Sequence, residues 1–201
     1  MMGRTHFAIG LATSLAVMQP KSLGGCMAAI FSGALGGVIA DIDTLTQSHS
    51  LKGQLLALKT ALGALIIDYI FKLGICESIM ANQTTALAGL ISFVVLGFMG
   101  YLSDHRTFTH SFPAMILYSL AIRLIYAPFG LGFLVAYLSH LILDLLNRKK
   151  IFLFYPLKFG MCLKLCYANR IADAFFMYIG YIAAAILLTV GFISGFAEIN
   201  I

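Results

Sequence analysis

The sequence has few charged residues and no tryptophan. Only 10% of its 201 residues are Asp, Glu, Lys or Arg, whereas 61% are hydrophobic. Soluble domains typically contain about 25% charged and about 45–50% apolar residues. This shortage of charge excludes an ordinary soluble domain and indicates an integral membrane protein. The chain has room for a single domain, 1–201, with about six or seven spans of about 20 residues each.

Closely spaced cysteine pairs and dense clusters of basic residues are also missing. The four cysteines show no tandem C-x-x-C spacing and are predicted to be small buried side chains. The formal net charge is +5, but Lys and Arg lie mainly between the apolar runs. That distribution favours a membrane-orientation signal over a nucleic-acid partner, so no nucleic acid is expected.

Apolar runs dominate what remains, and we interpret them as helices. A membrane span must satisfy its backbone polar groups internally, and the runs are too long and too uniformly apolar for barrel strands. The first run, at about 18 Å, is too short for roughly 30 Å of hydrocarbon and predicts half a span or a re-entrant helix unless neighbours cover its ends. The others are expected to be long enough, several of them only marginally. The predicted fold is all-α, a polytopic membrane helix bundle, with runs at 7–18, 23–39, 55–75, 84–102, 111–127, 130–146 and 174–197.

Ionisable side chains gather at one end of this predicted bundle. If each run crosses once, the segments 40–54, 103–110 and 147–173 return to the side that holds the N-terminus. That side also carries most of the Lys and Arg, so it is predicted to be cytoplasmic in a multi-pass membrane protein. Ionisable groups beside hydrocarbon are costly unless they meet one another or bind a cation. One shared site is therefore expected, formed by His6, Asp41, Asp43, His105, Arg106, His110, His140 and Asp144.

Two of these motifs point to a metal ion. His140 and Asp144 are four residues apart on an apolar helix, so an imidazole and a carboxylate share one face, as ligands of a divalent metal do. The alternative is a neutral hydrogen-bonded pair that joins two helices. Asp41 and Asp43 end the second run, where the helix dipole disfavours an anion unless a cation compensates it. The alternative for them is a solvated loop carboxylate.

The segment from Asp104 to Ser111 is rich in imidazole, guanidinium and hydroxyl groups. The planar fork of Arg106 fits phosphate oxygens, although an ordinary polar loop with an arginine is the alternative. By itself, His6 is more often an interfacial residue than a ligand. Asp173, beside Arg170 at the start of the last run, is either a direct metal ligand, a residue that supports a ligand from behind, or part of an Arg–Asp pair at the beginning of a helix.

Four ordered motifs resemble those of a known family. They are His6, Asp41-Ile42-Asp43, His105-Arg106-Thr107-Phe108-Thr109-His110-Ser111, and Tyr137-Leu138-Ser139-His140 with Asp144. Over roughly residues 6–175 the chain resembles the LexA-regulated, membrane-bound, predicted metal-dependent hydrolases typified by the inner-membrane protein YdjM. That family has Gly at the position of Thr107. The resemblance therefore predicts an altered loop, because threonine disfavours the positive φ that glycine allows.

The order of these motifs is more distantly similar to that of the zinc-dependent phospholipase C and P1 nuclease superfamily, helical enzymes that cleave phosphodiesters. This resemblance implies a phospholipase C/P1 nuclease-like core and zinc as the metal. The superfamily's tryptophan ligand has no equivalent here, so two ions are favoured over three. The ligands that the resemblance implies are His6, Asp41, His110, His140 and Asp144, with Asp173 in place of a later carboxylate.

The leading hypothesis is an integral membrane metal-dependent hydrolase. It would cleave a phosphoester of a membrane lipid or a lipid-linked substrate with a metal-activated water. Asp43 or His105 is expected to act as the base or to orient the water, and Arg106 to stabilise the developing charge on phosphoryl oxygens.

Two alternatives come from other functional classes. A proton or divalent-metal transporter or channel requires polar residues across the whole membrane, but the far halves of the runs have few ionisable residues besides Asp68, Lys72 and Arg123. A non-catalytic membrane protein with a structural metal would use the same ligands with a closed coordination sphere. The oligomeric state is left open.

Overall fold

The computed structural model of the chain consists of helices joined by short and irregular segments. It describes residues 2–44, 48–167 and 170–199, and the side chains of 48–50 and 194–199 lie outside the described part. Within these residues no β-strand forms, and extended backbone pairs once, at a bridge between Ile151 and Met161. The elements are α1 (Gly3–Met18), α2 (Leu23–Gly36), the 3₁₀ turn η1 (Ile39–Thr44), α3 (Ser48–Phe71), α4 (Ile75–Ala81), α5 (Gln83–Leu102), the 3₁₀ turn η2 (Phe108–His110), α6 (Phe112–Ile125), α7 (Phe129–Leu145) and α8 (Ile171–Ile199).

Each predicted apolar run coincides with a helix, so the all-α class is confirmed. The short helix α4 was not predicted. It follows Gly74, whose φ is 97°, and the carboxylate of Asp68 accepts hydrogen bonds from the backbone N–H groups of Ile75 at 3.0 Å and Cys76 at 2.7 Å. A carboxylate satisfies the free N–H groups of a helix start and opposes the positive end of its dipole. Asp68 therefore serves the fold, away from the predicted site.

Within the described residues, three helices are long and apolar enough to cross a membrane: Leu51–Phe71, Gln83–Leu102 and Ile171–Ile193. The expectation that every run after the first is long enough is wrong for α2, α6 and α7. Their 14 to 17 helical residues reach about 21–26 Å, less than about 30 Å of hydrocarbon. The lengths were overestimated because hydropathy does not show where a helix ends. The apolar run at 23–39, for example, continues past the end of α2 into the turn η1.

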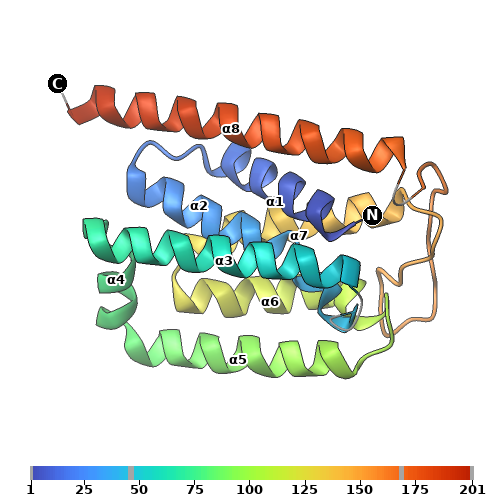
Figure 1. Ribbon diagram of the computed structural model, residues 1–201. Helices are drawn as coiled ribbons and strands as arrows, with labels where there is room; N and C mark the ends of the chain where they lie inside the picture. Colours follow the sequence, from blue (N-terminus) through green and yellow to red (C-terminus); the bar gives the residue numbers. More distant parts are fainter. Residues whose placement is uncertain (1, 45–47, 168–169, 200–201) are drawn as a thin grey trace.

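Helix α1 lies in the middle of the bundle and packs against α2, α3, α7 and α8 (Figure 1). Neighbouring helices thus enclose this short helix, which was one of the expected alternatives. Helices α3, α5 and α8 lie at the periphery and expose large apolar side chains, among them Leu58 (50% exposed), Phe98 (63%) and Ile182 (59%). Apolar surface on this scale suits contact with lipid rather than water.

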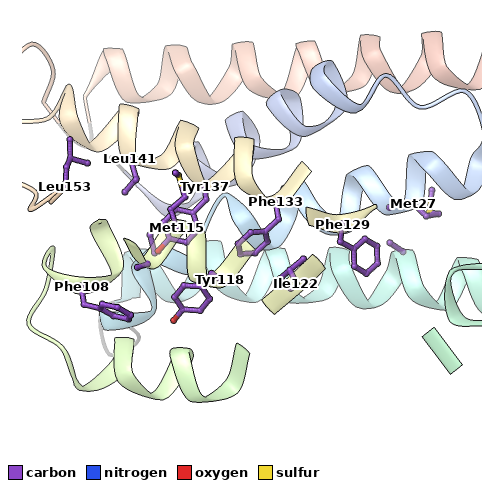
Figure 2. Close-up of a cluster of buried hydrophobic side chains, with 14 of the residues drawn as sticks. Met27, Phe108, Met115, Tyr118, Ile122, Phe129, Phe133, Tyr137, Leu141 and Leu153 are labelled. Atoms are coloured by element: carbon purple, nitrogen blue, oxygen red, sulfur yellow. The ribbon is translucent and has the colours of Figure 1, made fainter. Parts of the chain in front are cut away.

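Buried aromatic side chains fill the space between α6 and α7 (Figure 2). Tyr118, Phe129, Phe133 and Tyr137 are all fully buried. Phe93 of α5 meets the rings of Tyr118 and Phe133 edge-on, with centroid distances of 5.4 and 6.2 Å. Each large apolar side chain buried in this way stabilises the fold by about 1.5–3 kcal/mol. This core holds α7 in place, and α7 carries two of the predicted ligands.

The segments that carry the ionisable motifs gather at one end of the bundle, as predicted (Figure 1). The start of α1, the turn η1 and the segments 103–110 and 147–167 all lie at that end. Glycine permits the close approach of α1 and α2. A Cβ atom at Gly37 would lie 2.6 Å from the carbonyl oxygen of His6, and one at Gly33 would lie 2.8 Å from that of Gly10. This close packing brings the end of α2, and with it η1, next to His6.

Candidate metal centre

Four acidic and histidine side chains from three elements form one buried cluster, which we call the Asp–His group. Asp41 lies in η1, His110 ends η2, and His140 and Asp144 lie one turn apart on α7. Each residue offers one ligand atom, and these atoms all lie within 4.8 Å of one another. All four side chains are buried. The predicted convergence of residues far apart in the sequence is therefore confirmed.

The contacts within the Asp–His group are short, and His6 adjoins it. Asp144 Oδ2 lies 3.2 Å from His110 Nε2, and Asp144 Oδ1 lies 3.4 Å from Nε2 of His6. Asp41 Oδ1 lies 3.7 Å from Nε2 of both His110 and His140. The ring of His6 stacks on that of His140 with centroids 3.8 Å apart. The structure thus places His6 beside the other predicted ligands.

Contacts at Nδ1 orient two of the imidazoles. His140 Nδ1 donates to the carbonyl oxygen of Gly37 at 2.8 Å. His110 Nδ1 lies 3.1 Å from the hydroxyl of Thr109 and 3.6 Å from Asp43 Oδ2. A neutral imidazole that donates from Nδ1 carries its lone pair on Nε2. Both rings therefore direct Nε2 at the Asp–His group, in the way that protein groups orient a histidine for a metal.

The buried nitrogens test whether these residues fit a metal ion. In the described part of the chain, Nε2 of His6 and of His140 has no hydrogen-bond partner, although both rings are buried, and Nε2 of His110 faces the carboxylates of Asp41 and Asp144. A buried polar group without a partner costs about 1–3 kcal/mol. A divalent cation would satisfy such nitrogens in their neutral form and offset the carboxylate charges. Because two imidazoles and two carboxylates suit zinc and similar ions, the Asp–His group can hold a metal ion.

Asp43 ties the turn η1 to the segment that contains η2. Its Oδ2 accepts hydrogen bonds from the backbone N–H of Arg106 at 3.0 Å and the hydroxyl of Thr109 at 3.1 Å, and lies 3.1 Å from His105 Nδ1. The side chain of Asp43 is fully buried. Asp43 therefore orients His105 directly and His110 through Thr109. Asp43 and His105, the two residues predicted as a base, thus lie next to the Asp–His group.

The guanidinium of Arg106 is mostly buried and reaches the Asp–His group. Its Nη2 lies 3.4 Å from Asp144 Oδ2, Nη1 donates to the carbonyl of Lys149 at 3.1 Å, and Nε donates to His105 Nε2 at 3.1 Å. Thr107 has a φ of −99°, so it does not adopt the positive φ that glycine allows, and the altered loop stays a prediction. The left-handed backbone falls one residue earlier, on Arg106, with a φ of 69°.

Two other predicted residues lie at the edge of the site or outside it. His105 is the more accessible, with a side chain 34% exposed and its ring centroid 5.6 Å from that of His110. Asp173 lies at the start of α8 and is not part of the Asp–His group. Its Oδ1 accepts hydrogen bonds from the backbone N–H of Met2 and the hydroxyl of Thr5, both at 3.0 Å. Asp173 thus fastens α8 to the start of α1, which does not support the prediction that it is a direct ligand.

Sequence patterns did not single out the groups that orient the imidazoles. Thr109 contacts His110, and the hydroxyl of Tyr137 donates to the Thr109 carbonyl. Both residues belong to the family motifs described above. Their position close to a candidate ligand in the sequence could therefore have identified them. The carbonyl of Gly37, which receives the hydrogen bond of His140, carries no residue-type signal at all.

Charges within the site set its protonation before a metal binds. Burial by itself lowers the pKa of His110, but contacts with the Asp144 and Asp41 carboxylates outweigh burial and raise that pKa to about 9. Burial by itself raises the pKa of Asp41, but His140 and His110 hold it well below its usual value. At neutral pH the metal-free protein therefore carries a proton on His110 and a negative charge on Asp41.

Metal binding should release the proton of His110. Because Nε2 must be deprotonated to bind a metal, we expect the affinity for Zn²⁺ to fall as pH is lowered from 9 to 6, by about tenfold per pH unit for one proton. Calorimetric titration in buffers of different ionisation enthalpy measures the released proton. A binding enthalpy that is independent of the buffer at pH 7 would contradict this protonation state.

Comparison with family models establishes the relationship of this chain to known proteins. The model described as YdjM inner membrane protein matches residues 1–197. The chain belongs to this family. Neither the comparison with curated proteins nor that with solved structures gives a match. This match confirms the predicted YdjM family, and it agrees with the apolar helices long enough to span a membrane.

Proposed function

We propose that this YdjM-family protein is an integral membrane metal-dependent hydrolase that cleaves a phosphoester of a membrane lipid or a lipid-linked substrate. The observation that carries the proposal is the buried Asp–His group with the Arg106 guanidinium 3.4 Å from one of its carboxylates. A structural zinc site is closed by its protein ligands and needs no arginine beside it. An arginine fork supports a phosphoryl group as the reacting centre.

Zinc is the metal we propose, with two ions favoured over three. When bound, the metal would supply Lewis acidity and lower the pKa of water toward about 7. Five protein ligands would suit two ions better than three, because catalytic zinc sites use about three protein ligands each. The residues that would hold the metal are His6, Asp41, His110, His140 and Asp144.

The remaining polar side chains suit distinct roles. Arg106 would stabilise negative charge on the phosphoryl oxygens. Its Nε donates to His105 Nε2 in this structure, so a guanidinium that turns toward a substrate frees that nitrogen to accept a proton from water. Asp43, 3.1 Å from His105 Nδ1, would keep the ring in the required tautomer and act as a positioning residue.

The place of the Asp–His group suits a lipid-borne substrate. We propose that α3, α5 and α8 cross the bilayer, that the protein is multi-pass, and that the end with the Asp–His group faces the cytoplasm because most Lys and Arg lie there. A head group could then reach the site while its tails stay in hydrocarbon. The order of the motifs also supports a phospholipase C/P1 nuclease-like core and LexA regulation, both by resemblance alone.

Metal analysis combined with a substrate screen tests the proposal. Protein purified in detergent would be assayed for bound metal and for hydrolysis of lipid phosphodiesters and phosphomonoesters. We expect zinc to copurify and turnover to disappear on chelation and return with added zinc. Bound zinc without turnover on any substrate would favour a structural metal, and metal flux in proteoliposomes would favour a transporter.

A further inference from the structure

A second polar feature lies on the side of α1 away from the Asp–His group. Arg4 and His6 are two residues apart on α1, so their side chains leave the helix on roughly opposite faces, at about 100° per residue. His6 contacts Asp144, whereas Arg4 is exposed and lines a cavity between α3 and α8. Neither His6 nor any member of the Asp–His group lines this cavity.

The cavity consists of two adjoining hollows that share Arg4, Lys52 and Met177. One has a volume of about 400 Å³ and is also lined by Lys59 and leucines of α3. The other has a volume of about 540 Å³ and extends to the start of α8. We call the pair the α3/α8 groove, defined by Arg4, Lys52, Lys59, Arg170, Met177 and Tyr181.

Glycine lets both walls of the groove, α3 and α8, pack closely against α1. A Cβ atom at Gly53 of α3 would lie 2.6 Å from the carbonyl carbon of Gly3. A Cβ atom at Gly180 of α8 would lie 2.8 Å from the carbonyl carbon of Ala8. Gly53 is next to Lys52 and Gly180 is next to Tyr181 in the sequence. Close backbone packing on α1 therefore fixes the positions of both walls, as in a preformed binding site.

The groove concentrates positive charge. Arg4, Lys52, Lys59 and Arg170 line it, and among the described residues no carboxylate forms an ion pair with any of them. Its one acidic lining residue, Asp173, is held by hydrogen bonds to the start of α1. Lys52 and Lys59 are seven residues apart, so they share a face of α3 about 10 Å apart along the helix. Clustered cations at a membrane boundary attract anionic lipid head groups.

We propose that the α3/α8 groove binds a phospholipid with an anionic head group, at a site separate from the candidate metal centre. Its phosphate would lie among Arg4, Lys52 and Lys59. Its acyl chains would lie along the apolar outer faces of α3 and α8, where Leu62 and Ile182 are 50% and 59% exposed. The head group of a lipid would contact the basic residues while its acyl chains contact the apolar residues. A soluble anion could make only the first of these contacts.

Lipid binding to the full-length protein tests this assignment. Native mass spectrometry and thermal unfolding in detergent would compare phosphatidylglycerol, phosphatidylcholine and inorganic phosphate. We expect phosphatidylglycerol to occupy one saturable site and to raise the melting temperature, whereas the other two have little effect. The double variant Arg4→Gln/Lys52→Gln should bind phosphatidylglycerol about thirtyfold more weakly, because each basic residue near the membrane surface contributes a factor of about five.

Charge-matched variants separate the groove from general surface charge. Lys158→Gln/Lys164→Gln removes two exposed lysines outside the groove and should leave the affinity unchanged. Lys59→Gln alone should weaken binding about fivefold. The zinc content of all three variants, the two double variants and Lys59→Gln, should equal that of the wild type. The result of this test therefore does not depend on the proposed hydrolase activity.

Three outcomes would overturn the proposal. The first is equal affinity for phosphatidylglycerol and phosphatidylcholine. The second is an equal loss of phosphatidylglycerol affinity in the two double variants, and the third is binding of inorganic phosphate as tight as that of phosphatidylglycerol.

Discussion

Replacing Asp144 with alanine should remove the metal from the purified protein and abolish hydrolysis. The side chain is 1% exposed, and its carboxylate lies within 3.2–3.4 Å of His6, Arg106 and His110. Even loss of a residue that merely holds a metal ligand costs about 10- to 100-fold in affinity, and loss of a ligand from so small a set should cost more. Metal per chain, measured by mass spectrometry, and turnover on the same sample report the effect.

Asp68→Ala is a matched control for this variant. Asp68 is also a buried aspartate in an apolar helix, but it caps α4 outside the Asp–His group. We expect this variant to lose about 0.5–2 kcal/mol of stability, as other capping losses do, and to keep its metal and its turnover per folded molecule. If Asp144→Ala retained metal at the wild-type ratio, Asp144 would not be a ligand.

Replacing Arg106 with glutamine should lower kcat by about 10²–10³-fold, the usual cost of losing a donor to a developing anion. Metal content should stay near that of the wild type, because Arg106 is not a ligand. Since a charge stabilised only in the transition state affects kcat and kcat/KM alike, KM should change little. Arg106→Lys should recover turnover only in part, because lysine retains the charge but not the planar fork.

A neighbouring arginine is the control for the role of Arg106. Arg148 stacks on the ring of Tyr167, 3.7 Å from its centroid, and does not reach the Asp–His group. Arg148→Gln should leave kcat unchanged. Full turnover in Arg106→Gln would mean that Arg106 only fastens the chain through its hydrogen bond to the Lys149 carbonyl.

The candidate ligands were largely predictable from the sequence. His140 and Asp144 stand at helical spacing in an apolar run, and the chemistry of a buried imidazole and carboxylate depends on residue type and local periodicity. His6 alone was a weak candidate. It became convincing only because α1 is packed so closely against the end of α2 that its ring stacks on His140.

Other predictions failed for reasons that no local pattern contains. The apolar lengths of α2, α6 and α7 were overestimated, because hydropathy is insensitive to the 3₁₀ turns and caps that end a helix. The short helix α4 depends on the carboxylate of Asp68, seven residues before the first backbone N–H that it binds. No pattern indicated the left-handed backbone of Arg106, because dihedrals in an irregular segment follow from its tertiary contacts.

The amino-acid sequence was enough to predict the membrane class, the helical fold, the family motifs and the residue types able to bind a metal. These properties follow from composition, from apolar period and from side-chain chemistry, which are local. The three-dimensional packing was needed to show that Asp144 joins the Asp–His group while Asp173 fastens two helices. It was also needed to show that the imidazoles direct Nε2 inward and that Arg4 shares a groove with Lys52. Those outcomes depend on distances between segments remote in the chain, which are set by packing.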